Sequence, residues 1–197
     1  LLVFGRRAGA GAVDYVKQSQ AVKVSDTSIR NAAERIAAPF KREGGENPYT
    51  LHQELQEITH NLVGIIRTKT ELADAINKIA DIRKRIENVS VQGGRIFNPG
   101  FHLSFDLDNM LLVAESTAKS AIVREESRGG HTRDDFPVMN TKWRGLNNIS
   151  SFNGKEVVVK QQELPFMPKE LFSLFDVHEL EKYMSQEEID NILEGVK

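Results

Sequence analysis

The run ESRGGHTRDDFP, residues 126–137, holds the densest group of side chains in this sequence that could do chemistry. Arg128, His131 and Arg133 stand around a Gly-Gly pair. Glycine adopts positive φ at no steric cost, so the chain can bend there and bring the three side chains together. Because arginine binds a carboxylate or a phosphate through two parallel hydrogen bonds, such a group predicts a contact with an anion or a cofactor.

The same run also has a purely structural interpretation. Ion pairs that only stabilise a fold shift the pKa values of titratable groups much as active sites do. On the sequence alone we therefore favour an internal network of ion pairs, and the binding site stays open as the alternative. The carboxylates close enough in the sequence to neutralise the cations are Glu125, Glu126, Asp134 and Asp135.

Other kinds of site find little support in the residue types. The 197 residues include no cysteine, which excludes disulfides, thiolate metal sites and a cysteine nucleophile within this chain. His52 and His60 lie about two helical turns apart, too far to share a metal ion, so we expect no metal site. The net charge of -2 provides no basic field, so we expect no nucleic-acid partner.

The first 46 residues read as helical segments. Gly9-Ala10-Gly11 could suggest a dinucleotide phosphate loop, but a third glycine and a preceding strand are missing. We interpret residues 1–21 as a helix packed closely against another element. Residues 25–41 repeat apolar side chains at helical spacing, with Ser25 or Asp26 as the cap. The chain opens on Leu-Leu-Val-Phe, which is not an initiator sequence, so we expect a piece of a longer protein.

Three longer stretches carry apolar seams at alternating spacings of three and four residues: 47–67, 68 to about 92, and 106–127. The first two are joined by a short connection, so they must run antiparallel. The sequence predicts a mainly α fold built on an up-down-up three-helix bundle. The predicted seam residues are Leu51, Leu55, Ile58, Leu62, Ile65, Leu72, Ile76, Ile79, Ile82, Ile86, Leu107, Leu111, Ala114, Ala118 and Ile122.

Capping signals set the expected starts of these helices. Asn47 fits the residue before the first helix, and Thr68 with Glu71 forms a capping box for the second. Asp106 and Asp108 fit the start of the third, where a carboxylate is favourable near the helix dipole.

Beyond the third helix the periodicity collapses. Gly129-Gly130 fits a helix stop signal. We predict a strand at 156–160, a short helix at 169–175, and a second capping box at 185–188 that opens a final helix to about Val196.

Residues 126–137 resemble the signature Glu-Ser-Arg-Gly-x-His-x-Arg-x-Asp-Phe-Pro of the succinate dehydrogenase and fumarate reductase flavoprotein family. The likeness covers most of residues 1–145. LLVFGRRAGAGA resembles the helix that closes the family's FAD-binding domain. NPYTLHQELQEITHNLVGIIRTKTELADAINKI resembles the first two helices of its C-terminal helical domain, and FDLDNMLLVAESTAKSAIVREESRGGHTR resembles the third. Trp143, soon after Asp-Phe-Pro, favours this branch over L-aspartate oxidase, which shares the helical domain.

The resemblance implies three parts. Residues 1–46 would be the end of the FAD-binding domain, with its closing helix and a connecting helix. Residues 47–128 would form a spectrin-repeat-like three-helix bundle, and 129–197 a small irregular α+β tail with a short strand and helices. The candidate residues at the interface with the FAD-binding domain are Arg128, His131, Arg133 and Asp134.

The resemblance also implies the parent's activity. The parent would interconvert succinate and fumarate by hydride transfer with FAD and pass electrons to an iron–sulfur subunit. It would lie on the cytoplasmic face of the bacterial inner membrane and reach the membrane only through anchor subunits. The Gly-rich FAD loop and the catalytic residues lie upstream in the family, so we assign no catalytic residue here. We expect the chain alone to be a soluble, inactive scaffold without FAD.

Two other assignments stay open. One is a fragment of L-aspartate oxidase, which shares the helical domain and a similar Glu-Ser-Arg-Gly-x-His. The other is a free-standing helical module that recognises a partner through the cationic loop.

Overall fold

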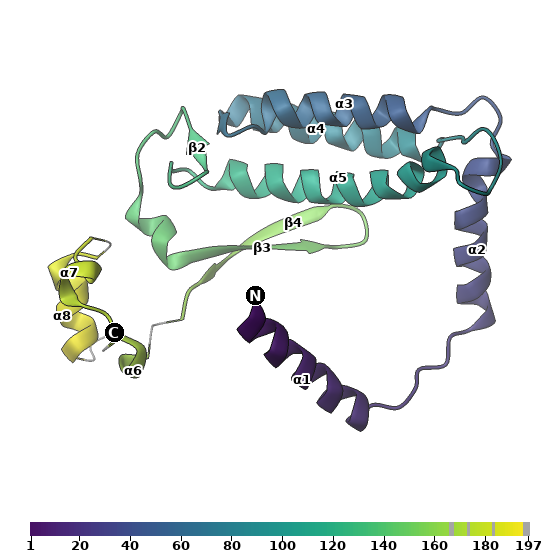
Figure 1. Cartoon of the computed structure of the whole chain (residues 1–197). Coiled ribbons are helices and arrows are strands. Elements are labelled where there is room, and N and C mark those ends of the chain that lie inside the picture. The colour runs from purple at the N-terminus through teal and green to yellow at the C-terminus, as the bar shows by residue number, and fades with distance from the viewer. Residues whose placement is uncertain (166–167, 173, 183, 195–197) are drawn as a thin grey trace. The chain divides into compact units, whose positions relative to one another are not determined.

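The computed structural model describes residues 1–165, 168–172, 174–182 and 184–194, and it is mainly helical (Figure 1). The chain forms two compact units, Leu1–Gln56 with Ala80–Leu111, and Glu57–Ile79 with Leu112–Lys197. We call them unit one and unit two. Figure 1 shows three long helices side by side, which confirms the predicted bundle: α3 (Pro48–Leu62), α4 (Lys69–Ile86) and α5 (Pro99–Val123).

Each of the three bundle helices has residues in both units. The predicted seams supply the core in each unit, because apolar residues three and four apart lie on one face of a helix. In unit one the buried seam residues are Leu51, Leu55, Ile82, Leu107 and Leu111. In unit two they are Leu72, Ile79, Ala114 and Ala118.

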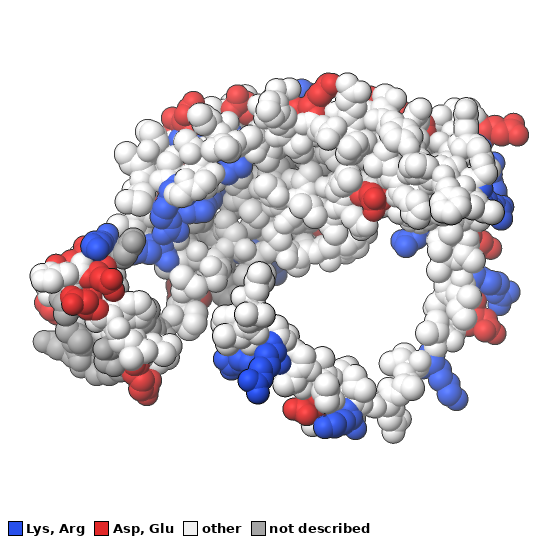
Figure 2. Space-filling view, viewed as in Figure 1, with Lys and Arg blue, Asp and Glu red and all other residues white. Residues whose placement is uncertain are grey.

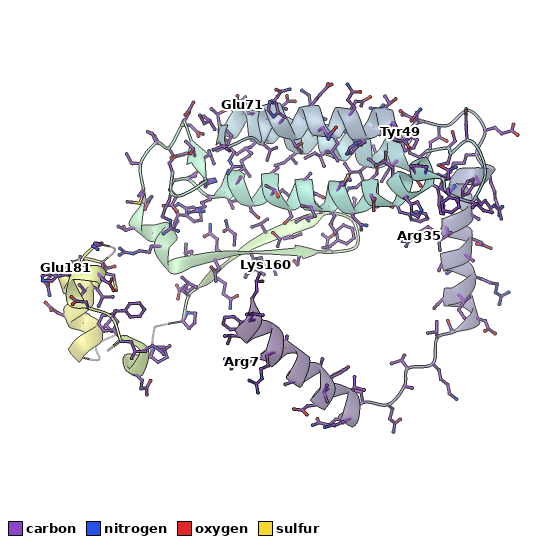
Figure 3. All side chains as sticks on the ribbon, viewed as in Figure 1. Arg7, Arg35, Tyr49, Glu71, Lys160 and Glu181 are labelled. Atoms are coloured by element: carbon purple, nitrogen blue, oxygen red, sulfur yellow. The ribbon has the colours of Figure 1, made fainter. Side chains whose placement is uncertain are left out.

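The predicted caps of α3 and α4 are present. The side-chain oxygen of Asn47 accepts from the Tyr49 N–H at 2.9 Å. At the start of α4, the Thr68 N–H donates to Glu71 Oε2 at 2.7 Å and the Glu71 N–H donates to Thr68 Oγ1 at 3.3 Å. Tyr49 and Glu71 mark these two starts in Figure 3. Each bond satisfies a backbone N–H that the first helical turn leaves without a partner.

The predicted ends of these two helices were too late. α3 ends at Leu62, and Ile65, predicted to lie in the core, is 73% exposed. The chain leaves the helix because Ile66–Arg67 forms the short strand β1, which pairs elsewhere in unit two. α4 ends at Ile86, where Val89 turns back to bridge to Glu46.

The predicted bounds of α5 were wrong at both ends. The helix begins at Pro99, and the side-chain oxygen of Asn98 accepts from the Phe101 N–H at 3.1 Å. Asp106 and Asp108 therefore lie inside the helix and do not cap it. A cap followed by proline at the first helical position is a strong start signal, and the predicted start at Asp106 missed it. The helix ends at Val123, well before the glycine pair.

Two further helices belong to unit one: α1 (Leu2–Gln18) and α2 (Asp26–Lys41). The predicted Ser25 cap of α2 accepts from the Ser28 N–H at 3.2 Å. Gly9 and its neighbours lie in the middle of α1, which rules out the phosphate-loop alternative. No residue of α1 is buried, so the expected close packing is not found among the described residues; Figure 3 shows its side chains, including Arg7, projecting from the helix.

A hairpin and three short helices follow the bundle in unit two. A 3-10 turn, η1 (Thr141–Gly145), leads into strand β3 (Leu146–Phe152), which pairs antiparallel with β4 (Val157–Glu163). The strand at 156–160 was predicted, but its partner β3 was missed. The hairpin is joined to α5 by Lys119, whose Nζ lies 2.8 Å from Glu115 Oε1 and 2.7 Å from Glu156 Oε2.

The last three helices are α6 (Lys169–Phe172), α7 (Val177–Leu180) and α8 (Gln186–Glu194). They share a small core of Phe172, Leu180 and Ile189. The predicted capping box opens α8, with the Ser185 N–H donating to Glu188 Oε2 at 2.7 Å. The predicted end near Val196 lies outside the described residues.

Candidate functional site

The Gly-Gly pair forms the bend that its sequence predicts. Gly129 has a φ of +61°, in the left-handed region that favours glycine. The Arg128 N–H donates to the His131 carbonyl at 2.9 Å, and the His131 N–H donates back at 3.2 Å. This closed turn places Arg128 and His131 across from each other.

A distant arginine joins them. Strand β1 pairs in parallel with β2 (Thr132–Arg133), with Ile66 opposite Thr132 and Arg67 opposite Arg133. No local pattern indicates that Arg67 belongs to the site, because it lies 64 residues from His131 and was assigned to the end of a helix. Only the strand pairing reveals it.

Arg133 is fully buried and belongs to the fold. Its Nη1 donates to the carbonyls of Ala121 and Ile122 at 3.0 and 3.1 Å, near the end of α5. The last turn of a helix leaves carbonyls short of backbone partners; the Ala121 carbonyl accepts from the Arg124 N–H at 3.3 Å, and the guanidinium adds a second donor and complements the negative end of the helix dipole. Its Nε and Nη2 donate to the two oxygens of Asp135, each at 2.7 Å. The ion-pair interpretation of this residue is therefore right.

Glu126 is the second buried member of the network, with 0% exposure. Arg124 donates to its Oε1 through Nε and Nη2 at 2.9 and 2.7 Å, and the Asn140 N–H donates to Oε2 at 3.1 Å. Arg128 Nη2 lies 3.3 Å from the same Oε1. Burial by itself raises the pKa of this carboxyl, but the Arg124 and Asn140 hydrogen bonds and the two positive charges outweigh it, so the pKa is lowered.

His131 is held in one tautomer by its two partners. Its Nε2 lies 2.9 Å from the Arg124 carbonyl, which can only accept, so Nε2 carries the proton. Its Nδ1 lies 2.8 Å from Arg67 Nη2, which can only donate, so Nδ1 is the bare acceptor. Burial, together with the charges of Arg67, Arg124 and Arg133, lowers the pKa of this imidazole below its usual range, although the Arg124 backbone contact works against that shift.

The four residues predicted as a site thus divide into two pairs. His131 and Arg133 are buried within this chain's own network. Arg128 has a side chain 37% exposed, and Asp134 is exposed. A backbone turn joins Arg128 to His131, and Asp134 makes no ion pair within the part of the chain that the structure describes.

A cleft of about 470 Å³ opens beside this network in unit two. Figure 2 shows Lys and Arg side chains gathered in the same region, around the end of α5 and the segment before η1. Within the described chain the cleft lining includes no Asp or Glu. Its charged and polar lining includes Arg67, Arg124, Arg128, His131, Asn147 and Asn148.

No metal-binding group and no membrane span appear among the described residues. His, Asp and Glu side chains nowhere gather in threes in an arrangement that could hold a metal ion in that part of the chain. None of the described helices has both the length and the apolar character to cross a membrane.

A family model described as "Fumarate reductase flavoprotein C-term" matches residues 52–171, which include α4, α5, the arginine network and the hairpin. The chain belongs to this family. The predicted membership of the succinate dehydrogenase and fumarate reductase flavoprotein family is thereby confirmed, and so is the helical fold class.

Similar proteins include both named and uncharacterised flavoproteins. A "Fumarate reductase flavoprotein subunit" of Haemophilus influenzae is 33% identical over 139 residues, which are 69% of this chain and 23% of that protein. An "Uncharacterized FAD-dependent oxidoreductase" of Methanocaldococcus jannaschii is 36% identical over 147 residues, 73% of this chain and 25% of that protein. The chain therefore spans about a quarter of the length of these curated relatives.

A solved structure extends the match to nearly the whole chain. A chain of the Mycobacterium smegmatis Sdh1 complex in the apo form superposes with a TM-score of 0.87 and 46% identity. The match covers 95% of this chain and 33% of that chain.

Membership of a flavoprotein family raises the question of which residues would hold FAD. Phosphate groups of such cofactors bind at a glycine-rich turn between a strand and a helix. Here the run around Gly9 is continuous helix, and the cleft of unit two is lined by residues of the arginine network. The described residues of this family member do not provide that phosphate cradle.

Proposed function

We propose that this chain is the C-terminal helical part of the FAD-containing subunit of a succinate dehydrogenase or fumarate reductase. The observation that carries the proposal is the 46% identity with the Mycobacterium smegmatis Sdh1 chain over 95% of this sequence. In the proposed parent, a hydride passes between a substrate carbon and flavin N5 as succinate and fumarate interconvert. The electrons then leave through an iron–sulfur subunit. That chemistry belongs to the flavin and to the domains that bind it.

The proposed role of these 197 residues is a scaffold without catalytic residues. Residues 1–46 would belong to the FAD-binding domain, 47–128 to the helical domain and 129–197 to the C-terminal tail. The exposed apolar side chains of α1 support the first assignment, because a helix with Leu2, Phe4 and Val16 in water needs a covering surface.

The signature loop would support the interface with the FAD-binding domain in two ways. Arg133 and His131 would set the shape of the loop from inside, since both are buried in it. Arg128 and Asp134 would face the neighbouring domain, since both are accessible. Such support matters because a small displacement of reacting groups slows a hydride transfer substantially.

The partners and location follow from the same proposal. The parent would sit on the cytoplasmic face of the bacterial inner membrane, bound to its iron–sulfur subunit. Contact with the membrane would be through anchor subunits only.

The test is an activity assay on the complete gene product that contains this chain. We expect it to carry FAD and to reduce an artificial electron acceptor with succinate, or to oxidise a reduced dye with fumarate. The control is the 197-residue chain alone, which should bind no flavin and show neither activity. Oxidation of L-aspartate in place of succinate would replace the proposal with the aspartate oxidase assignment.

A further inference from the structure

The arginine network of unit two is not neutral. Its four arginines are Arg67, Arg124, Arg128 and Arg133. Its carboxylates are Glu126, which Arg124 and Arg128 share, and Asp135, which Arg133 holds. Two carboxylates against four guanidinium groups leave two positive charges without a counter-charge, and His131, held as the neutral tautomer, adds none.

Arg67 is the clearest case of an uncompensated cation. Its Nη1 donates to the Val63 carbonyl at 3.0 Å and its Nη2 to His131 Nδ1 at 2.8 Å, and both acceptors are uncharged. Its Nε is buried and has no hydrogen-bond partner, and no carboxylate pairs with it within the described chain. Burial and the nearby charges of Arg133 and Arg124 disfavour the cation and lower its pKa. A partly buried charge left in this state costs free energy until an anion neutralises it.

The cleft gives an anion room and further hydrogen-bonding groups. It is lined by Arg67, Arg124 and Arg128, and its other polar lining includes the amides of Asn147 and Asn148. The Asn148 Nδ2 donates to the Ser120 carbonyl at 3.2 Å, while its Oδ1 is buried without a partner. The Asn148 Oδ1 is an acceptor and gains no hydrogen bond from an oxyanion, so the donors that the cleft offers are the guanidinium groups and the Asn147 amide. A volume of about 470 Å³ falls in the usual range for small-molecule sites.

We propose that this cleft binds a small oxyanion with two negative charges, such as inorganic phosphate or a short dicarboxylate. Such an anion would supply the two missing charges and accept from the guanidinium groups of Arg67, Arg124 and Arg128, which line the cleft. Guanidinium groups bind phosphate and carboxylate with the same two-pronged geometry, so both chemistries fit. The inference rests on the charge balance of this chain and not on the proposed flavin chemistry.

The test exploits a conservative change in the lining. Asn147→Asp places a carboxylate in the cleft at nearly constant volume, where it supplies one of the missing charges. Asn153→Asp is the matched control, because Asn153 lies in the turn of the same hairpin, where its Oδ1 accepts from the Lys155 and Glu156 N–H groups and an aspartate can do the same. Thermal unfolding of the complete gene product is followed in millimolar phosphate, succinate or chloride at fixed ionic strength.

Phosphate or succinate should raise the unfolding temperature of the wild type and of Asn153→Asp in a saturable way, relative to chloride. In Asn147→Asp the affinity should fall by about ten-fold or more, which corresponds to about 1.4 kcal/mol. Without added anion, Asn147→Asp should unfold at a higher temperature than the wild type. A response to phosphate alone or to succinate alone identifies the better ligand and supports the site.

Two outcomes would overturn the proposal. The first is that phosphate raises the unfolding temperature no more than chloride does and that succinate does not raise it at all. The second is a response that Asn147→Asp retains in full, since succinate bound only at another site of the enzyme would give that result.

Discussion

The two neighbouring aspartates of the signature run show how differently adjacent residues can act. Asp135 binds the buried Arg133 through two hydrogen bonds of 2.7 Å and also accepts from the Lys69 N–H at 3.0 Å. The Arg133 hydrogen bonds lower the pKa of Asp135 to about 2, against the opposing effect of burial. Asp134 is exposed. The pattern of charges in the sequence does not separate the two residues.

We expect Asp135→Asn to destabilise the chain by about 2–3 kcal/mol, because it leaves the Arg133 guanidinium buried without a counter-charge. Asp134→Asn, one position away, should change the free energy of unfolding by less than about 0.5 kcal/mol. Urea unfolding of both variants at neutral pH measures the difference. Equal stability of the two would show that the ion pair contributes nothing. Since the pKa of Asp135 is lowered, its contribution is present above about pH 4 and is lost as the pH falls towards 2.

His131 gives the chain a pH dependence in a higher range. Its pKa is lowered in the folded state, so the unfolded chain binds the proton more readily. Stability from this group is therefore complete above the unfolded value of about 6.5 and falls as the pH drops below it. A proton on Nδ1 would face the Arg67 Nη2 donor at 2.8 Å, which is the physical cause of the loss.

The measurement is the unfolding temperature between pH 7.5 and pH 5.5. The wild type should lose more stability over this interval than His131→Gln, whose amide does not titrate. His60→Gln is the control, since His60 is exposed on α3 and the variant should follow the wild type. A wild-type profile that the His131 variant reproduces would refute the role of this imidazole.

At the scale of elements, the apolar seams were predictable and the ends of the helices were not. Periodicity identifies a helix because its buried face repeats regardless of what surrounds it. The end of a helix depends on which competing partner the backbone finds. Ile66–Arg67 left α3 because it pairs with Thr132–Arg133, a contact that no local pattern predicts.

The start of α5 offers a direct test of a corrected prediction. Asn98→Ala should destabilise the chain by about 1–2 kcal/mol, because it removes the acceptor for the Phe101 N–H and two donor contacts to the Gln92 and Gly94 carbonyls. Asp106→Ala should have an effect below about 0.5 kcal/mol, since Asp106 is exposed inside the helix. Chemical unfolding of both variants decides which of the two residues caps α5. The reverse order of effects would restore Asp106 as the cap.

The candidate site was only partly predictable for the same reason. Arg128, Gly129 and His131 are close in sequence, so their convergence follows from a local turn. Arg67 and the hairpin residues Asn147 and Asn148 come from distant segments, and their meeting at one cleft depends on strand pairing and on the packing of β3 near α5. The missed strand β3 is rich in Asn and Ser, which have low strand propensity, so its composition does not predict a strand.

At the scale of the whole molecule, the proposed function assigns the chain a neighbouring FAD-binding domain. It spans about a quarter of its curated relatives, and its first helix buries none of its residues. By contrast, the buried side-chain nitrogens of the four arginines in unit two have hydrogen-bond partners within that unit, except Arg67 Nε. The proposed FAD-binding domain would cover α1, and the proposed anion would balance the charge at the cleft.

The parallel pair β1–β2 also sets an order of events during folding. Arg67 and His131 are separated by 64 residues, which include α4 and α5. Closing a loop of that length costs chain entropy, and only the prior formation of those helices shortens the effective loop. The arginine cleft should therefore assemble late, after the bundle helices. Two short strands with few bonds should also open before the bundle does, so amide protons there should exchange ahead of those in the helical core.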